Sequence, residues 1–183
     1  MSDLVSEQSP SITMMPEDTA SHTVLNCADL PAGALGDLLA NYDLIIKPVK
    51  LTEQIPGSFW QAPEAGLVAN ELYLRNDTPV HSALHEACHY ICMDEARRSQ
   101  LHTNAGGDYD EENAVCYLQL LLANYLTGFS FTRATQDMDA WGYSFRLGST
   151  LAWFEQDSDD ARQWLLNKSL ISADNTPTWQ LRS

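Results

Sequence analysis

One short segment near the middle of the chain, HSALHEACHYIC, constrains the fold more than any other part of the sequence. It begins at His81 and carries three of the five histidines of the chain, together with two cysteines and a glutamate. On an ideal helix, with about 100° per residue, four of these side chains fall within roughly 60° of His85, namely His81, Cys88, His89 and Cys92. The apolar residues cluster on the opposite side. We therefore expect a helix whose apolar side packs on the domain and whose histidine side faces a protected cleft.

The composition limits the class of protein. The chain has 183 residues, 44% of them hydrophobic, which is enough for one packed core. A formal net charge of −15 repels phosphate backbones and anionic lipids, so we expect neither nucleic acid nor membrane as a partner. No signal peptide or membrane span is apparent, and the irregular spacing of the four cysteines favours free thiols. A cytoplasmic protein is expected, and its oligomeric state is left open.

The order of sequence patterns predicts one domain after a leader. Residues 1–22 are rich in Ser, Pro, Thr and acidic residues and are expected to form a flexible leader, so that residues 23–183 form a single domain. A short helix is predicted at 31–42, and strands are predicted at 43–49 and 66–75. The expected fold class is α+β, mainly helical, with a helix pair and a small antiparallel sheet.

Helical periodicity covers most of the remaining chain. The histidine helix is predicted to begin after a cap at Asp77 or Thr78 and to run to about Arg98. A turn with paired glycines then precedes a second, antiparallel helix from about Asp110 to Leu126. The segment TQDMDAWGYSFRLGSTLAWFEQ also repeats its apolar residues at helical spacing, and SDDARQWLLNKSL indicates a shorter capped helix.

The histidine face contains the pattern HExxH, formed by His85, Glu86 and His89. Histidines four residues apart on a helix aim two imidazoles at one point, with the glutamate just beside it. Two nitrogen ligands leave a zinc ion short of its usual set, so a third protein ligand must come from elsewhere and a water can take the open position. The pattern predicts a site for one Zn²⁺, and the alternative is an ordinary structural helix.

The second helix offers two candidates for the third ligand. Glu111 is followed by apolar residues at helical spacing, so it begins a stripe that faces inward, whereas Glu112 shares a face with Gln119. The helix dipole also favours a carboxylate in the first turn, so a capping role is open to both. Glu111 is the preferred ligand, and Glu112 is the alternative.

These residues resemble the gluzincin type of zinc metallopeptidase, in which HExxH on one helix is completed by a Glu on the next. The resemblance extends from NELYLR through ANYL, roughly a third of the chain, and EENAVCYLQLLL is most similar to the Glu-x-x-Ala-(Asn or Asp) helix of the ImmA/IrrE family. It implies a zincin-like domain that hydrolyses peptide or amide bonds through a zinc-bound water, with His85, His89 and Glu111 as ligands and Glu86 as general base. Val115 stands where those families place Asn or Asp, so hydrogen-bonding support for a ligand histidine must come from elsewhere.

Further expectations concern the substrate. The resemblance implies an edge strand at ELYLR that pairs with an extended peptide or protein substrate. Hydrolysis also needs a hydrogen-bond donor for the oxygen that gains negative charge. The sequence offers His81, His102, Tyr109, Tyr143 and Arg146 as oxyanion donors or as residues that support the ligands.

Two other functions stay open. One is a binding or regulatory protein that keeps a zincin scaffold without catalysis. The other is a metal or redox sensor that uses Cys88 and Cys92 together with the histidines. Four ligands from one straight helix cannot readily surround an ion, so structural cysteines are the favoured interpretation.

Overall fold

The computed structural model describes residues 22–58, 63–102 and 105–183, so the leader predicted at 1–22 lies outside the described residues except for His22. The elements in chain order are η1 (Cys27–Asp29), α1 (Ala34–Leu39), η2 (Ala40–Tyr42), β1 (Ile45–Pro48), β2 (Gly66–Val68), β3 (Glu71–Leu74), α2 (Val80–Cys92), α3 (Glu95–Arg98), α4 (Tyr109–Ala123), α5 (Phe131–Trp141), α6 (Thr150–Gln156) and α7 (Asp159–Asn167). The fold is α+β and mainly helical, as predicted.

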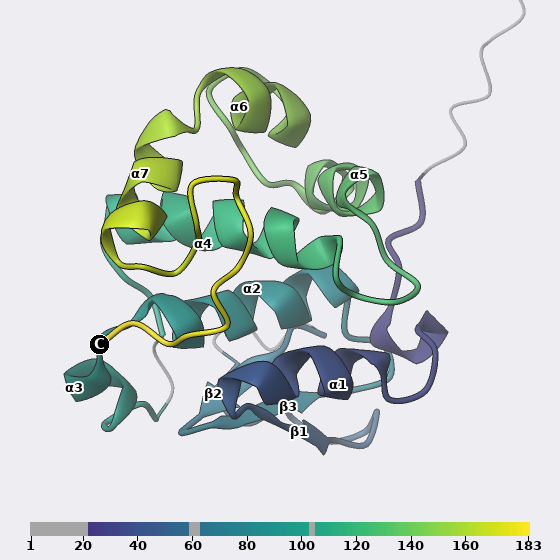
Figure 1. Ribbon diagram of the computed structural model, residues 1–183. Helices are drawn as coiled ribbons and strands as arrows, with labels where there is room; N and C mark the ends of the chain where they lie inside the picture. The colour runs from purple at the N-terminus through teal and green to yellow at the C-terminus, as the bar shows by residue number, and fades with distance from the viewer. Residues whose placement is uncertain (1–21, 59–62, 103–104) are drawn as a thin grey trace, which may run out of the picture.

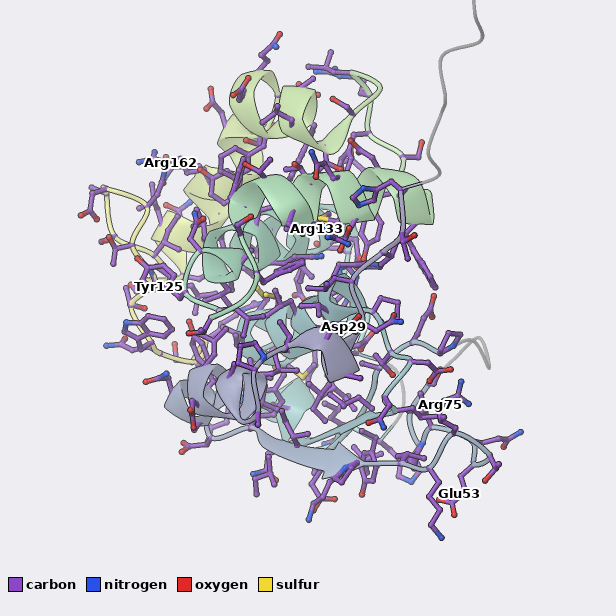
Figure 2. All side chains as sticks on the ribbon, turned by 90° about the vertical axis from the view of Figure 1, so that its right-hand side faces the viewer. Asp29, Glu53, Arg75, Tyr125, Arg133 and Arg162 are labelled. Atoms are coloured by element: carbon purple, nitrogen blue, oxygen red, sulfur yellow. The ribbon has the colours of Figure 1, made fainter. Side chains whose placement is uncertain are left out.

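The elements are stacked in layers (Figure 1). The sheet and α1 lie at one end, α2 packs on the sheet, α4 packs on α2, and α5 and α7 pack on α4. In the side view of Figure 2, Arg133 marks the α5 layer, and Glu53 and Arg75 mark the sheet end. One continuous core of buried side chains extends from α1 and the sheet through α2 and α4 to α7. Among the described residues, every helix is too short or too polar to cross a bilayer.

The sheet is mixed, with the order β1-β3-β2. The prediction of one strand over 66–75 is wrong, because Ala69 adopts a left-handed backbone with φ 53° and reverses the chain between β2 and β3. β2 and β3 pair antiparallel, but β1 pairs parallel to β3, so the prediction of an antiparallel sheet is wrong for the strands at 43–49 and 66–75. Because β3 has a neighbour on each side, the prediction that ELYLR is an edge strand is also wrong.

The histidine helix ends earlier than predicted. The chain leaves the helix after α2, and the Asp94 carboxylate then accepts a hydrogen bond from the Arg97 amide to begin α3 as a separate helix. The predicted caps do not act at the start of α2, where Pro79 occupies the cap position without a side-chain bond. Asp77 and Thr78 bond instead within the preceding turn.

The helical pattern from 135 to 156 is interrupted. α5 ends at Gly142, whose φ of 103° lies in the left-handed region that favours glycine. α6 begins only after Ser149, whose hydroxyl accepts a hydrogen bond from the Ala152 amide. The Asp139 carboxylate accepts hydrogen bonds from the amide and hydroxyl of Thr150 and thus ties the two helices together. The irregular segment 142–149 between them borders the cavities described below.

Candidate metal centre

The structure brings three ligand groups together between α2 and α4: His85, His89 and Glu112. The Nε2 atoms of the two histidines lie 3.1 Å apart. The Glu112 carboxylate oxygens lie 3.2 Å from Nε2 of His85 and 3.5 Å from Nε2 of His89. Two atoms that each lie about 2.1 Å from a tetrahedral zinc ion are themselves about 3.4 Å apart. The three groups could therefore hold a metal ion such as zinc.

The antiparallel arrangement of α2 and α4 produces this convergence. The chain enters α4 on the side where α2 ends (Figure 1). Glu112, in the first turn of α4, consequently meets His89 near the end of α2. Gln119, two turns later on the same face of α4, meets His85 and the backbone of His81. One face of α4 thus supplies both a carboxylate and a neutral amide to the histidines.

Gln119 orients the ring of His85. Its side chain is fully buried, and its Oε1 lies 2.9 Å from Nδ1 of His85. Its Nε2 donates to the backbone oxygen of His81 at 3.1 Å, which leaves the amide oxygen to accept from the imidazole. With the proton on Nδ1, the Nε2 lone pair of His85 faces His89 and Glu112. Gln119 therefore provides the support for a ligand histidine that Val115 does not.

Glu111, the preferred ligand in the sequence analysis, points away from the histidines. It is buried as predicted, with 4% exposure, but both carboxylate oxygens lie 2.8 Å from Nη1 of Arg97, and one lies 3.1 Å from Nη1 of Arg182. A buried carboxylate needs cationic partners, and α3 and the C-terminal segment supply them. The structure therefore favours Glu112, the alternative in the sequence analysis, over Glu111 as the candidate third ligand. The face that Glu112 shares with Gln119 was the sequence signal for this choice.

Two cavities meet at the candidate centre. The larger, of about 540 Å³, is lined by His85 and Glu112, and the smaller, of about 300 Å³, is lined by His85 and Glu86. Tyr143 also lines both cavities. His85 is therefore reached from both cavities and Glu112 from the larger one, and the HExxH glutamate lies on the smaller one.

The electrostatics of the cluster tie its members together. Burial opposes ionisation of Glu112, but hydrogen bonds and the charges of His85 and His89 lower its pKa well below the usual value. Burial by itself lowers the pKa of His85, but Tyr143, Cys116 and Glu112 raise it well above the usual value. For Glu86, burial raises the pKa, and the two histidines only partly oppose this rise. The site thus keeps Glu112 ionised, whereas Glu86 is protonated more readily in the site than a glutamate in water.

Two of the predicted donors lie beside the ligands. His81 is 1% exposed, and its ring lies 5.2 Å from that of Trp141 and 5.6 Å from that of Tyr143. Among residues 22–58, 63–102 and 105–183, neither of its ring nitrogens has a hydrogen-bond partner. Burial lowers the His81 pKa to about 4, so the ring is neutral at pH 7. The Tyr143 ring lies edge-on to His85 at 5.7 Å, and burial raises the Tyr143 pKa to about 12, which keeps the hydroxyl protonated.

The other predicted donors are farther from the ligands. Tyr109 and Arg146 line the larger cavity, where Tyr109 is largely exposed and Arg146 pairs with Asp157. His102 lies on the exposed loop after α3 and lines neither cavity. Of the predicted donors, the structure therefore brings only His81 and Tyr143 close to the histidine ligands.

The cysteines are free thiols with buried surroundings. Cys88 and Cys92 are fully buried in the core, and among the described residues the metal-ligand group includes neither of them. Burial raises the pKa of both thiols, which makes them unreactive. Cys116 is also buried but lines the larger cavity. These observations agree with structural roles for Cys88 and Cys92.

No protein-family model, curated protein or solved structure matches the chain, so the interpretation of this site rests on its geometry.

Proposed function

We propose that the protein is a zinc-dependent hydrolase of peptide or amide bonds, in which His85, His89 and Glu112 bind the metal and Glu86 is the general base. The observation that carries this proposal is the convergence of three ligand atoms where two cavities meet, beside a partly buried carboxylate. Three protein ligands with access for a fourth, external ligand are typical of catalytic zinc, whereas structural zinc is closed by four.

Zinc in this position would activate a water molecule and polarise a substrate carbonyl. Glu86 lies on the same helix as both histidines and lines the smaller cavity, so it can accept a proton there and pass it to the leaving amine. The Tyr143 hydroxyl and the neutral His81 ring are the donors available to the oxygen that gains negative charge. Gln119 keeps the His85 ring in one tautomer and orientation throughout.

A cytoplasmic or other reducing location belongs to this proposal, supported by four cysteines that are all free. The burial of Cys88 and Cys92 does not favour the thiol-based sensor. A non-catalytic binding protein with the same fold and metal site would differ from an enzyme only in failing to hydrolyse a substrate.

The decisive variant is Glu86→Gln, which keeps the size of the side chain and removes its basicity. We expect the zinc content to stay at one ion per chain and hydrolysis of a fluorogenic peptide library to fall by a factor of about 100 or more. Glu155→Gln, an exposed change on α6 that borders neither cavity, is the matched control and should leave both unchanged.

Three results would each remove part of the proposal. Purified protein that binds no zinc would remove the metal centre. Equal hydrolysis by the wild type and Glu86→Gln would remove the assigned base. A protein that binds zinc but hydrolyses nothing in the library would favour the non-catalytic alternative.

A further inference from the structure

The two cavities at the metal centre, which we call the cleft, carry an excess of negative charge. Their acidic lining residues are Glu64, Glu86, Asp110, Glu112, Asp157 and Asp160. The basic side chain on the described lining is Arg146, and it already pairs with Asp157. With Glu86 and Glu112 assigned to the metal centre, Glu64, Asp110 and Asp160 remain without an ionic partner among the described residues.

The walls of the larger cavity are aromatic. Phe145 and Trp153 stack with ring centroids 4.5 Å apart, and Tyr143 stacks on Phe145 at 6.4 Å. The faces of aromatic rings attract cations, most strongly where carboxylates are close. A volume of about 540 Å³ is within the range of pockets that enclose a ligand.

An independent observation in the smaller cavity also points to a ligand. His81 lines this cavity, is almost completely buried, and has no hydrogen-bond partner for either ring nitrogen within the part of the chain that the structure describes. Buried polar atoms in folded proteins are nearly always hydrogen-bonded, because leaving one unpaired destabilises the fold. A ligand whose amide or carbonyl groups reach the smaller cavity would satisfy this ring.

We propose that the cleft binds a basic polypeptide segment, with its main chain beside Glu86 and His81 and a Lys or Arg side chain in the larger cavity. There the cation lies between Asp110, Asp160 and the stacked rings of Phe145 and Trp153. The statement that the bound segment is also the substrate rests on the proposed function. The preference for positive charge is independent of that function, because it follows from the acidic lining of the cleft.

The test measures binding, so it does not depend on turnover. Three fluorescein-labelled dodecapeptides share their apolar positions and carry Lys and Arg, Gln, or Glu at the others. Their affinities are measured by fluorescence anisotropy for zinc-loaded Glu86→Gln and for metal-free wild type. We expect the basic peptide to bind tightest to both, the acidic peptide weakest, and the difference to shrink as salt is added.

The variants identify where the charge acts. Asp110→Asn combined with Asp160→Asn should weaken the basic peptide about tenfold and leave the neutral peptide within about twofold. Asp159→Asn is the matched control, because Asp159 precedes Asp160 in the first turn of α7, carries the same charge and does not line the cleft. Equal melting temperatures show that the variants fold.

Each outcome decides one question. The inference is overturned if the peptides bind equally, if none binds, or if Asp159→Asn weakens binding as much as the double variant. Binding of the basic peptide without zinc-dependent hydrolysis removes the proposed function and leaves the inference. Zinc-dependent hydrolysis with no preference for basic peptides supports the proposed function and overturns the inference.

Discussion

At the residue scale, Glu111 and Glu112 are neighbours in one helical turn with opposite surroundings. The Glu112 side chain is 44% exposed and faces two histidines, while Glu111 is buried between two arginines. A step of about 100° along the helix is enough to move a carboxylate from one environment to the other. In the proposed function Glu112 binds the metal, whereas Glu111 forms ion pairs that stabilise the fold.

Single substitutions separate these two roles. Glu112→Gln should lower zinc affinity by a factor of about 100 or more and lower the stability of the metal-free protein by less than Glu111→Gln does, because the Glu112 side chain is partly exposed. Glu111→Gln should keep zinc affinity and lower the free energy of unfolding by about 2 kcal/mol, because Arg97 and Arg182 lose their shared carboxylate. Zinc titration and urea unfolding measure the two quantities. Loss of zinc from Glu111→Gln but not from Glu112→Gln would reverse the assignment.

At the element scale, α2 and α4 act as one unit through Gln119. This side chain bonds the ring of His85 and the backbone of His81 at the same time, so the register between the helices and the orientation of a ligand are coupled. Neither bond can be inferred from one helix alone.

Replacing Gln119 tests this coupling. Gln119→Leu should lower zinc affinity by a factor of about 10 to 100. Without the Gln119 oxygen, Nδ1 of His85 loses its hydrogen-bond acceptor, and the imidazole is no longer held in one tautomer. Gln119→Glu keeps an acceptor at the same place and should restore most of the affinity. If Gln119→Leu binds zinc as tightly as the wild type, another group orients His85.

At the scale of the whole molecule, a metal bound between α2 and α4 would stabilise every layer packed on them. Free zinc at about 100 times its dissociation constant should raise the free energy of unfolding by about 2.7 kcal/mol, and His85→Ala should abolish the effect. Thermal unfolding with and without zinc measures it. An equal shift in His85→Ala would place the zinc elsewhere.

The same measurement has a defined pH dependence. A raised His85 pKa means that the metal-free site holds a proton that contributes stability at low pH and is lost as the pH rises through that pKa. Zinc must displace this proton, so its stabilising effect should grow between about pH 6 and about pH 8. A zinc effect that shrinks over this range would contradict the assigned ligand.

Local patterns predicted α1, β1, α2 and α4, because their signals come from residues within one or two turns. They did not predict the breaks after Cys92 and at Gly142. There the apolar periodicity continues in the sequence, but Asp94 and Ser149 cap new helices and Gly142 takes a left-handed backbone. Turn chemistry overrode periodicity at these points.

The sequence by itself determined the mainly helical fold and the histidine face of α2, and it narrowed the candidates for a third ligand to two adjacent glutamates, since helix geometry decides which side chains share a face. Only the tertiary structure decided between those glutamates, because Arg97 and Arg182 reach Glu111 from α3 and the C-terminal segment. It also decided that Gln119 supports His85 and that two acidic cavities meet at the candidate centre. These contacts join residues far apart in the chain, and a local pattern carries no information about such distances.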